Sequence, residues 1–183
     1  MDEKNSAAIR FSMMLYRDDQ IALKDLYTVF DDWTSYYKQH FPEFDVSGTY
    51  TPGKWEMLTA VGIIHQHVFL SHPWYDCADI TIGLSKLRPA KKLRVDWDRL
   101  AESFRFHVRE DGMEHVDIYY QIASAARSFD EVLVVLEPGD EGHLLAFVMK
   151  DKITEAQSLA RKIAIYDDRD DRFGDLIVAG VEL

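Results

Sequence analysis

The sequence predicts one α+β (mixed α/β) domain over residues 1–183, with a mainly antiparallel or mixed central sheet of about five to six strands packed against about four helices. Three observations predict this class. The chain has 183 residues, of which 47% are hydrophobic and 13% aromatic, enough to fill a core. Segments with alternating hydrophobicity are interspersed with segments of helical periodicity. Two pairs of apolar runs are close enough to form hairpins, which argues against a purely parallel sheet.

The N-terminal part of the chain is predicted to form one strand followed by one helix. Apolar and more polar residues alternate over 9–16, which is the period of a half-buried strand. Asp18 and Asp19 then offer side-chain caps for a helix N-terminus. The apolar residues of 26–37 recur at spacings of four, three and four, so we expect a helix that ends before Pro42.

Two further strands are predicted before residue 86. Residues 61–70 are rich in β-branched side chains, and Gly62 disfavours a helix there. Apolar and small polar residues alternate again over 80–84, which predicts a second strand. The two strands are close enough in the chain to form a hairpin across residues 72–79.

The second half of the chain is predicted to combine helices with strands. Two continuous apolar runs, 132–136 and 144–149, flank a loop rich in turn residues, so we expect an antiparallel hairpin covered on both faces. Thr154 and Gln157 have capping-box spacing and open a helix. The remaining predicted elements are helices over 97–108 and 113–129, the capped helix over 154–165, and a final strand over 176–181.

The net charge bears on which partners the protein can bind. With 21 Lys and Arg against 32 Asp and Glu, the formal charge is −11. Such a chain repels phosphate backbones, so no direct nucleic-acid binding is expected. Residues 86–99 reverse the trend, because six basic and two acidic side chains give this segment a net charge of +4. We interpret it either as a solvated connector or as a docking strip for an acidic partner or a phosphorylated ligand.

Motifs for common cofactors and nucleophiles are not found in the sequence. It has no Gly-x-x-x-x-Gly-Lys-[Ser/Thr] and no Gly-x-Gly-x-x-Gly, so no cofactor is expected. It also has no Gly-x-Ser-x-Gly motif. Cys77 is the single cysteine, which excludes an internal disulfide, and its acidic neighbours Asp76 and Asp79 would raise the pKa of its thiol. An enzyme is therefore the less favoured class.

One alternative is a small metal-dependent hydrolase. His65 and His67 are two residues apart, so on a strand both imidazoles would point to the same side and approach one metal ion. His72 lies five residues further on, and Asp76 and Asp79 follow. A metal site needs three or four such ligands to converge, and these histidines can equally pack beside aromatic residues on a sheet face.

The favoured hypothesis is a cytoplasmic, non-catalytic acidic protein that inhibits or neutralises another macromolecule, as a toxin-immunity protein or a phage-encoded inhibitor does. Carboxylates would complement a basic surface on a protein partner, and aromatic loop residues would anchor the contact. No apolar run reaches the about 20 residues needed to cross a bilayer, so no membrane contact is expected. The protein would act as a monomer or homodimer, and a structural homo-oligomeric subunit is the other alternative. The predicted partner contacts are Asp31, Asp32, Trp55, Trp74, Tyr75, Asp167, Asp168, Asp170 and Asp171.

Overall fold

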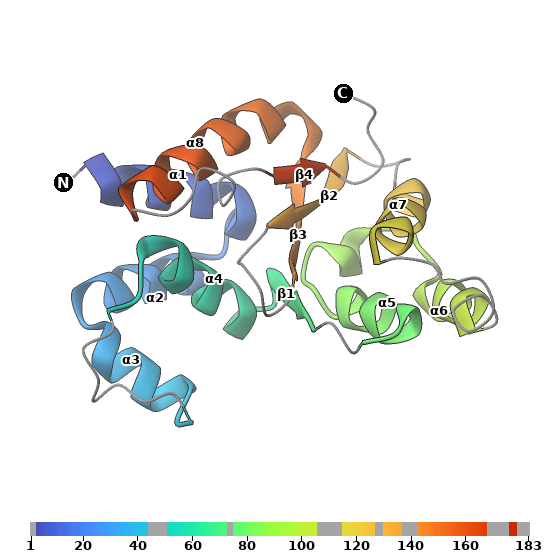
Figure 1. Cartoon of the computed structure of the whole chain (residues 1–183), viewed down its shortest axis with the longest axis horizontal. Coiled ribbons are helices and arrows are strands. Elements are labelled where there is room, and N and C mark those ends of the chain that lie inside the picture. The colour runs from blue at the N-terminus through green and yellow to red at the C-terminus, as the bar shows by residue number, and fades with distance from the viewer. Residues whose placement is uncertain are drawn as a thin grey trace.

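In the computed structural model the chain folds into a four-stranded antiparallel sheet with α-helices on both of its faces (Figure 1). The fold is mixed α+β and mostly helical. The described ranges contain eight α-helices and four strands, so the predicted sheet of about five to six strands with about four helices is wrong. The structure describes residues 3–43, 51–72, 75–105, 115–126, 130–136, 143–167 and 176–178.

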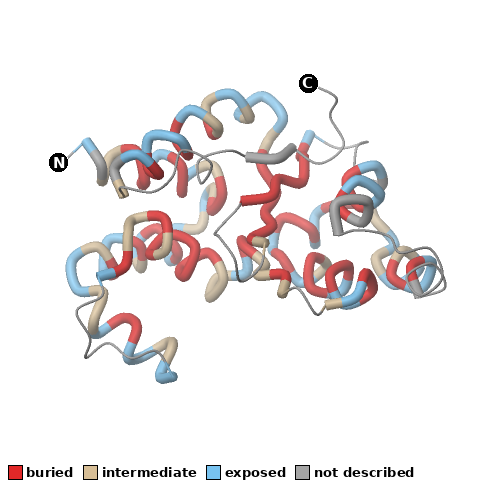
Figure 2. Tube along the Cα trace, viewed as in Figure 1, coloured by how far each residue is buried: buried red, intermediate tan, exposed pale blue. Residues whose placement is uncertain are grey.

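The sheet is built from β1 (Val68–Ser71), β2 (Glu131–Leu136), β3 (His143–Met149) and β4 (Leu176–Val178). Its strand order is β1-β3-β2-β4, and every neighbouring pair is antiparallel. The longest ladder joins β2 to β3, from Glu131 opposite Met149 to Leu136 opposite Leu144. Both strands are buried along nearly their whole length (Figure 2). The predicted hairpin, covered on both faces, is thus confirmed.

Alternate side chains of β2 and β3 contribute to two separate cores, one on each face of the sheet. Val132 and Val134 belong to the first core, and Leu133 and Val135 belong to the second. That residues 1–183 form a single domain stays a prediction. The first core is covered by α1 (Glu3–Tyr16), α2 (Gln20–Asp31), α3 (Trp33–His40), α4 (Lys54–Ile64) and α8 (Ile153–Tyr166), and the second by α5 (Cys77–Ser85), α6 (Trp97–Arg105) and α7 (His115–Ala126). Two short 3-10 helices are η1 (Ala90–Lys92) and η2 (Lys150–Lys152).

Helices α1 and α8 pack side by side in the first layer (Figure 1). Phe11 of α1 and Ile163 of α8 are both fully buried in the first core. Arg10 Nη2 donates a hydrogen bond to Glu155 Oε1 at 2.5 Å across the two helices. Residues 145 positions apart in the chain therefore meet in this layer.

The predicted strand over 9–16 is instead the C-terminal part of α1. Ala8, Phe11 and Leu15 are spaced by three and four residues and are all buried, so the apolar residues of this segment have helical as well as strand spacing. Met13 completed the alternating pattern but is 53% exposed. Packing against α8 selects the helix, and that contact is not visible in the local sequence.

The helix predicted after Asp18 and Asp19 is divided into α2 and α3. Asp32 has a non-helical backbone conformation between them. Its amide donates to Thr28 O at 2.9 Å, and its Oδ1 accepts a hydrogen bond from Ser35 N at 3.0 Å. One residue therefore ends α2 and caps α3, which the continuous apolar spacing concealed.

The predicted strand over 61–70 is half helical. Its first four residues belong to α4, and β1 begins only at Val68. Gly62 is buried in α4, where a Cβ would lie 2.5 Å from Val68 Cγ2. The glycine therefore marks a close approach between helix and strand, although in the sequence it argued against a helix.

The predicted strand over 80–84 lies within α5, and β1 pairs with β3 rather than with this segment. The helix begins after Asp76, whose Oδ1 accepts from Asp79 N at 2.8 Å, while Asp79 Oδ2 accepts from Asp76 N at 3.3 Å. These two carboxylates thus form a reciprocal helix cap. The alternating pattern predicted a strand wrongly because α5 is buried on several sides, so its apolar residues are not confined to one helical face. The residues concerned are Ile80, Thr81, Gly83 and Leu84, which are all buried.

The other predicted helices are confirmed close to their expected places. Helices α6, α7 and α8 begin at residues 97, 115 and 153, within two residues of the predicted starts. Strand β4 is the described part of the predicted final strand, and residues 106–108, 113–114, 127–129 and 179–181 of these predictions lie outside the described ranges. Among the described helices, none combines the length and apolar composition that a membrane crossing requires.

Candidate functional site

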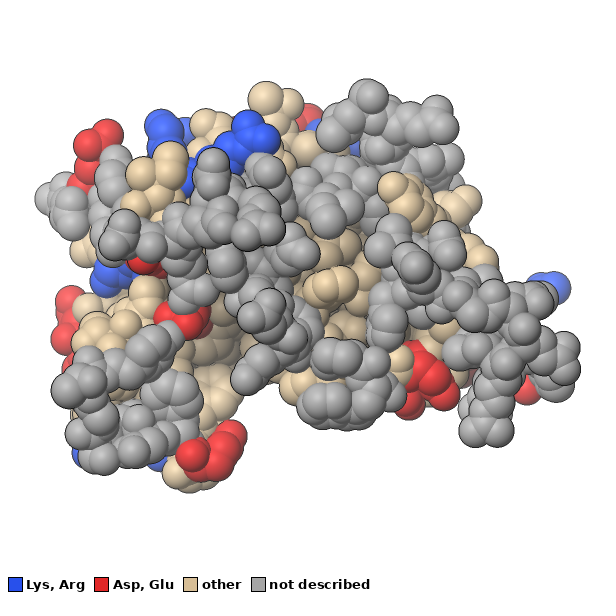
Figure 3. Space-filling model, in the orientation of Figure 1, with Lys and Arg blue, Asp and Glu red and all other residues tan. Residues whose placement is uncertain are grey.

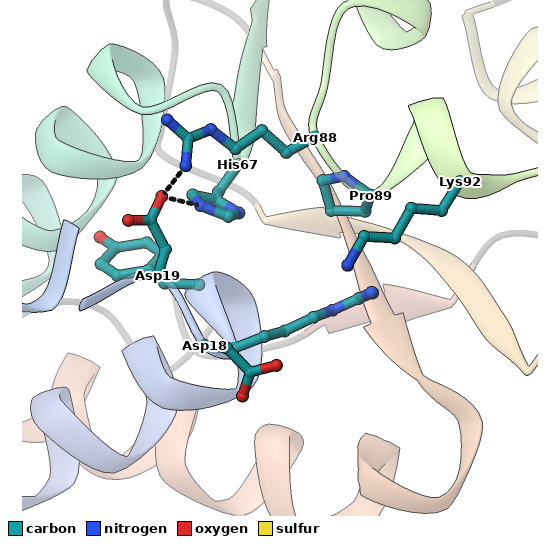
Figure 4. Close-up of a pocket in the computed structure, with 8 residues that line it drawn as sticks. Asp18, Asp19, His67, Arg88, Pro89 and Lys92 are labelled. Carbon is teal, nitrogen blue, oxygen red and sulfur yellow. Dashed lines mark hydrogen bonds and ion pairs between the residues drawn. The ribbon is translucent and has the colours of Figure 1, made fainter. Parts of the chain in front are cut away.

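A pocket of about 290 Å³ opens where segments of the two helical layers meet (Figure 4). Three pieces of chain form it: the α1–α2 turn, the α4–β1 turn and the segment after α5. Arg17, with φ of 56°, and Gln66, with φ of 59°, have left-handed backbone conformations that make the two turns tight. The lining residues are Tyr16, Arg17, Asp18, Asp19, His67, Arg88, Pro89 and Lys92.

Gln66 attaches the α4–β1 turn to the segment after α5. Its backbone carbonyl accepts a hydrogen bond from Arg88 N at 2.8 Å, and its Oε1 accepts one from Lys91 Nζ at 3.0 Å. Arg88 and Lys92 line the pocket, whereas Lys91, engaged by Gln66, does not. Lys91 therefore holds the α4–β1 turn, whereas its neighbour Lys92 lines the pocket.

Asp19 is at the centre of the hydrogen-bond network in the pocket. Its Oδ1 caps α2, because it accepts hydrogen bonds from Ile21 N at 3.2 Å and Ala22 N at 3.1 Å. Its Oδ2 accepts from His67 Nε2 at 3.0 Å and from Arg88 Nη1 (dashed lines in Figure 4). Burial alone would raise the pKa of this carboxyl, but the hydrogen bonds and the Arg88 charge outweigh burial and hold the pKa below its usual range. Asp19 is therefore a carboxylate at neutral pH.

His67 has a side chain that is only 4% exposed, and its ring lies 5.3 Å from that of Tyr16 between centroids. Because the Asp19 carboxylate can only accept, the hydrogen bond between them requires the proton on His67 Nε2. Burial lowers the pKa of His67, and this outweighs the opposing effect of Asp19, so the ring is neutral at pH 7. Its second nitrogen, Nδ1, is then a buried acceptor that has no hydrogen-bond partner among the described residues.

Arg17 contributes a cation from the α1–α2 turn. Its Nη1 donates to Glu131 Oε1 of β2 at 2.6 Å, forming a partly buried ion pair. Its Nε and Nη2 atoms are buried and find no hydrogen-bond partner within the described ranges, and neither does Glu131 Oε2. An unpaired buried donor costs about 1–3 kcal/mol, and more when it is charged. The ion pair with Glu131 thus leaves the guanidinium incompletely satisfied.

Arg88 and Lys92 supply two further cations from the opposite wall. The Arg88 side chain is 49% exposed and bonds the Asp19 carboxylate with one of its nitrogens. Lys92 is exposed and extends from the segment after α5 toward the Asp18–Asp19 turn (Figure 4). The described part of the chain gives the Lys92 amine no hydrogen bond or ion pair. Both side chains therefore have donors available to a ligand.

The lining combines three cations with two carboxylates, so with His67 neutral it carries a net charge of +1. A small anion can accept hydrogen bonds from Lys92 and from the unused donors of Arg88. The side chains that set this balance are Arg17, Arg88 and Lys92 on the positive side and Asp18 and Asp19 on the negative side.

Comparisons with known proteins add no assignment to this pocket. No family model matches the chain. No curated protein matches it, and no solved structure does either. Its function therefore has to be inferred from the geometry and charges of the lining residues themselves.

Nucleophilic side chains are not available in the pocket. The Tyr16 hydroxyl, the single hydroxyl among the lining residues, donates to Leu58 O, and burial raises its pKa. Cys77 lies in the second core, where burial, with a smaller effect of Asp76, raises the pKa of its thiol to about 11. The arrangement is suited to binding rather than to nucleophilic catalysis.

The three histidines predicted as metal ligands do not converge. His65 Nε2 lies 2.8 Å from Asp25 Oδ2, whereas His67 bonds the Asp19 carboxylate. The two are in a turn rather than on a strand, so their rings do not share one side of a sheet. His72 follows the far end of β1. Within the described ranges, no group of three or more His, Cys, Asp or Glu residues could hold a metal ion.

Trp55 and Asp167, predicted as partner contacts, hold the N-terminus of α4 in place. Trp55 is 1% exposed, and its ring packs against that of Phe11 at 5.3 Å. Asp167 Oδ2 accepts a hydrogen bond from Trp55 N at 2.9 Å and lies so close to Gly53 that a Cβ there would be 2.5 Å from it. Trp55 is therefore a core residue, and Asp167 is a helix cap supplied from the end of α8.

The other predicted partner contacts are in mixed surroundings. Asp31 is exposed, Asp32 caps α3, and the Tyr75 ring stacks on that of Phe69 at 6.0 Å. On the face shown in Figure 3, the coloured carboxylates lie in several separate groups with cations among them. The inhibitor function predicted from the sequence stays a prediction. Trp74, Asp168, Asp170 and Asp171 lie outside the described residues.

The sequence indicated only some of the residues that line the pocket. Arg88 and Lys92 fall in the basic strip over 86–99, whose charge suggested a docking surface for an acidic partner or a phosphorylated ligand. Arg17 gave no such signal, because its role depends on the turn after α1 and on a glutamate 114 residues away. His67 was noticed as a metal ligand, but its partner Asp19 is 48 residues away in the chain.

Proposed function

We propose that this protein is a non-catalytic binding protein for a small anionic ligand, held in the pocket between Arg17, Arg88 and Lys92. The observation that carries the proposal is the convergence of these three cations on one pocket from the α1–α2 turn and the segment after α5. An anion bound there would accept charge-assisted hydrogen bonds, which are stronger than neutral ones.

The protein itself neutralises this positive charge incompletely. Arg88 shares the single Oδ2 atom of Asp19 with His67, and its side chain is about half exposed. Lys92 has no ion-pair partner in the part of the chain that is described. Like charges gathered on one pocket repel one another, and a bound anion relieves that repulsion. Ligand binding is therefore favoured by electrostatics as well as by hydrogen bonding.

The dimensions of the pocket limit the size of the ligand. Its volume of about 290 Å³ is at the lower end of the range of about 300–1,000 Å³ typical of small-molecule sites. One anionic group with a small substituent fits this space. The single hydroxyl of the lining, that of Tyr16, is buried and bonded to Leu58 O, which supports binding without nucleophilic chemistry.

The proposal is tested by isothermal titration calorimetry of the full chain with inorganic phosphate and, separately, with sulfate. Lys92→Gln removes one cation that no described residue binds, so the fold is preserved. We expect it to weaken the binding of each anion by about tenfold or more, because one hydrogen bond between charged groups contributes about 1.5–3 kcal/mol. The double variant R88Q/K92Q should abolish measurable binding.

Lys91→Gln is the matched control, because Lys91 is the adjacent lysine but bonds Gln66 and does not line the pocket. We expect K91Q to bind both anions within about twofold of the wild type. If K91Q loses as much affinity as K92Q, the effect is one of general charge and not of this pocket. If the wild type binds neither anion, the proposed function is wrong.

A further inference from the structure

We infer that the group held in this pocket is a phosphate monoanion that keeps an acid proton, as a phosphate monoester or inorganic phosphate can, and that His67 Nδ1 selects it over sulfate and over phosphodiesters. This inference rests on the proposed anion-binding function and adds the chemical class of the ligand. All of these anions present tetrahedral oxygens to Arg88 and Lys92. Only the protonated phosphate also presents a hydroxyl donor.

His67 Nδ1 is the acceptor that would receive the hydrogen bond from this phosphate hydroxyl. It is buried, with less than 1 Å² of exposed area, and no described residue donates to it. Asp19 Oδ2 holds the other ring nitrogen at 3.0 Å, which fixes the orientation of the ring and keeps its proton on Nε2. An unpaired buried acceptor is costly, so a ligand hydroxyl gains more at Nδ1 than it gains from water.

Arg88 is the cation next to His67. Both side chains bond the same atom, Asp19 Oδ2, and the Arg88 side chain runs alongside the His67 ring in Figure 4. Arg88 is about half exposed, and without it Asp19 keeps His67 and two backbone amides as partners. The Arg88 guanidinium can therefore turn from Asp19 to a bound anion without leaving Asp19 unpaired.

The charge of the pocket favours a monoanion. The lining residues sum to +1, which one negative charge neutralises; Glu131 pairs with Arg17 but does not line the pocket. A protonated phosphate monoester has a charge of −1, whereas sulfate has −2 and meets more repulsion from Asp18 and Asp19. A phosphodiester has the favourable charge of −1 but no acid proton. Comparison of sulfate with a phosphodiester therefore separates the effect of charge from that of the hydroxyl donor.

His67 remains an acceptor because of the groups around it. Burial, the Arg88 charge and the neighbouring His65 disfavour its protonated form, and together they outweigh Asp19, which favours it. Tyr16 of α1 contributes a ring contact without charge. The other charged groups that line the pocket are Arg17, Asp18 and Lys92.

Calorimetric titrations of the wild-type protein at pH 6.5 test the inference directly, because the lowered pKa keeps most of His67 neutral there and roughly a quarter of a phosphate monoester still carries its proton. The four probes are methyl phosphate, inorganic phosphate, sulfate and dimethyl phosphate. We expect methyl phosphate and inorganic phosphate to bind about tenfold more tightly than the other two, which is the value of one hydrogen bond to an otherwise unpaired group. The relative affinities of methyl phosphate and inorganic phosphate distinguish a monoester from the free ion as the better ligand.

His67→Gln tests the role of Nδ1. The glutamine amide can still donate to Asp19 in place of Nε2, but it offers no acceptor at the position of Nδ1. We expect the preference for protonated phosphates over dimethyl phosphate to fall to within about twofold. His65→Gln is the matched control, since His65 pairs with Asp25 outside the pocket, and it should keep the tenfold preference.

The outcomes separate this inference from the proposed function. If sulfate and dimethyl phosphate bind the wild type as tightly as methyl phosphate, or if H67Q keeps the preference, the selection by Nδ1 is wrong while anion binding stands. If none of the four anions binds, both proposals fail. The wild-type comparison does not depend on the stability of any variant, and a thermal melt shows whether H67Q is folded.

Discussion

Asp19→Asn and Asp19→Ala separate two tasks of one carboxylate, helix capping and charge pairing. Asparagine is as good an N-cap as aspartate, so D19N keeps the hydrogen bonds from Ile21 N at 3.2 Å and Ala22 N at 3.1 Å. It puts an NH2 donor in place of Oδ2, so it removes the negative charge and with it the acceptor for His67 Nε2 and Arg88 Nη1. D19A removes the charge and the cap together. The difference between the two variants therefore measures the cap, and the effect of D19N measures the pairing of Oδ2 with His67 and Arg88.

The expected magnitudes follow from the surroundings of each partner. The Arg88 side chain is 49% exposed, so its ion pair with Asp19 contributes about 0–1 kcal/mol. His67 is buried, and leaving its Nε2 proton without an acceptor costs about 1–3 kcal/mol. D19N should thus lower the free energy of unfolding by about 1–4 kcal/mol. D19A also loses the cap, worth about 0.5–2 kcal/mol, and should be less stable than D19N by that amount.

Urea unfolding followed by circular dichroism at a common m-value gives these differences. Because the Asp19 pKa is lowered in the folded state, the wild-type advantage over D19N is present at neutral pH and is lost as the pH falls through the folded-state pKa. The reasoning is refuted if D19N is as stable as the wild type at pH 7, or if D19A is no less stable than D19N. Either result would mean that this carboxylate does not join the turn to α2 and His67.

Three further predictions concern other residues. Because burial lowers the pKa of His67, the unfolded chain binds this proton more readily than the folded chain, and the free energy of unfolding should fall as the pH drops below about 6.5. H67Q should make this dependence on pH shallower, and equal slopes for H67Q and the wild type would contradict the prediction. Gly62→Ala would place a Cβ 2.5 Å from Val68 Cγ2 and should cost about 1–3 kcal/mol in urea unfolding; an unchanged midpoint would show that the helix and strand are not so close. The Cys77 thiol, with a pKa of about 11, should react with iodoacetamide at pH 8 about a hundredfold more slowly in the folded chain than in urea, and similar rates would place it at the surface.

Elements with a single clear pattern could be predicted from the sequence. Strands β2 and β3 are continuous apolar runs separated by turn residues, and no other element fits them as well. Residues 9–16, by contrast, satisfy both periodicities, since Phe11 and Leu15 face the core in a helix and in a strand. Helix α8, which begins at residue 153, decides between the two. Distant packing of this kind is not encoded in a local window.

The site could be predicted only where its residues are close in sequence. Asp19 was expected to cap a helix, and it does, but its bonds to His67 and Arg88 span 48 and 69 residues. The charge of the segment over 86–99 located two of the three cations. The left-handed conformation of Gln66 separated His65 from His67, and nothing in the sequence around them indicated it.

The pairing of α1 with α8 imposes an order on biosynthesis. α1 leaves the ribosome with Phe11 and Leu15 ready for burial, but the helix that packs against it begins only at Ile153. At about 5–20 residues per second, translation of the intervening chain takes roughly 7–30 s. During that interval α2 and α4 can already pack against α1, but the part of α1 that faces α8 is open to chaperones and to neighbouring nascent chains. The second core, formed by α5, α6, α7 and the sheet, can close sooner, so the core that starts with the first helix is completed last.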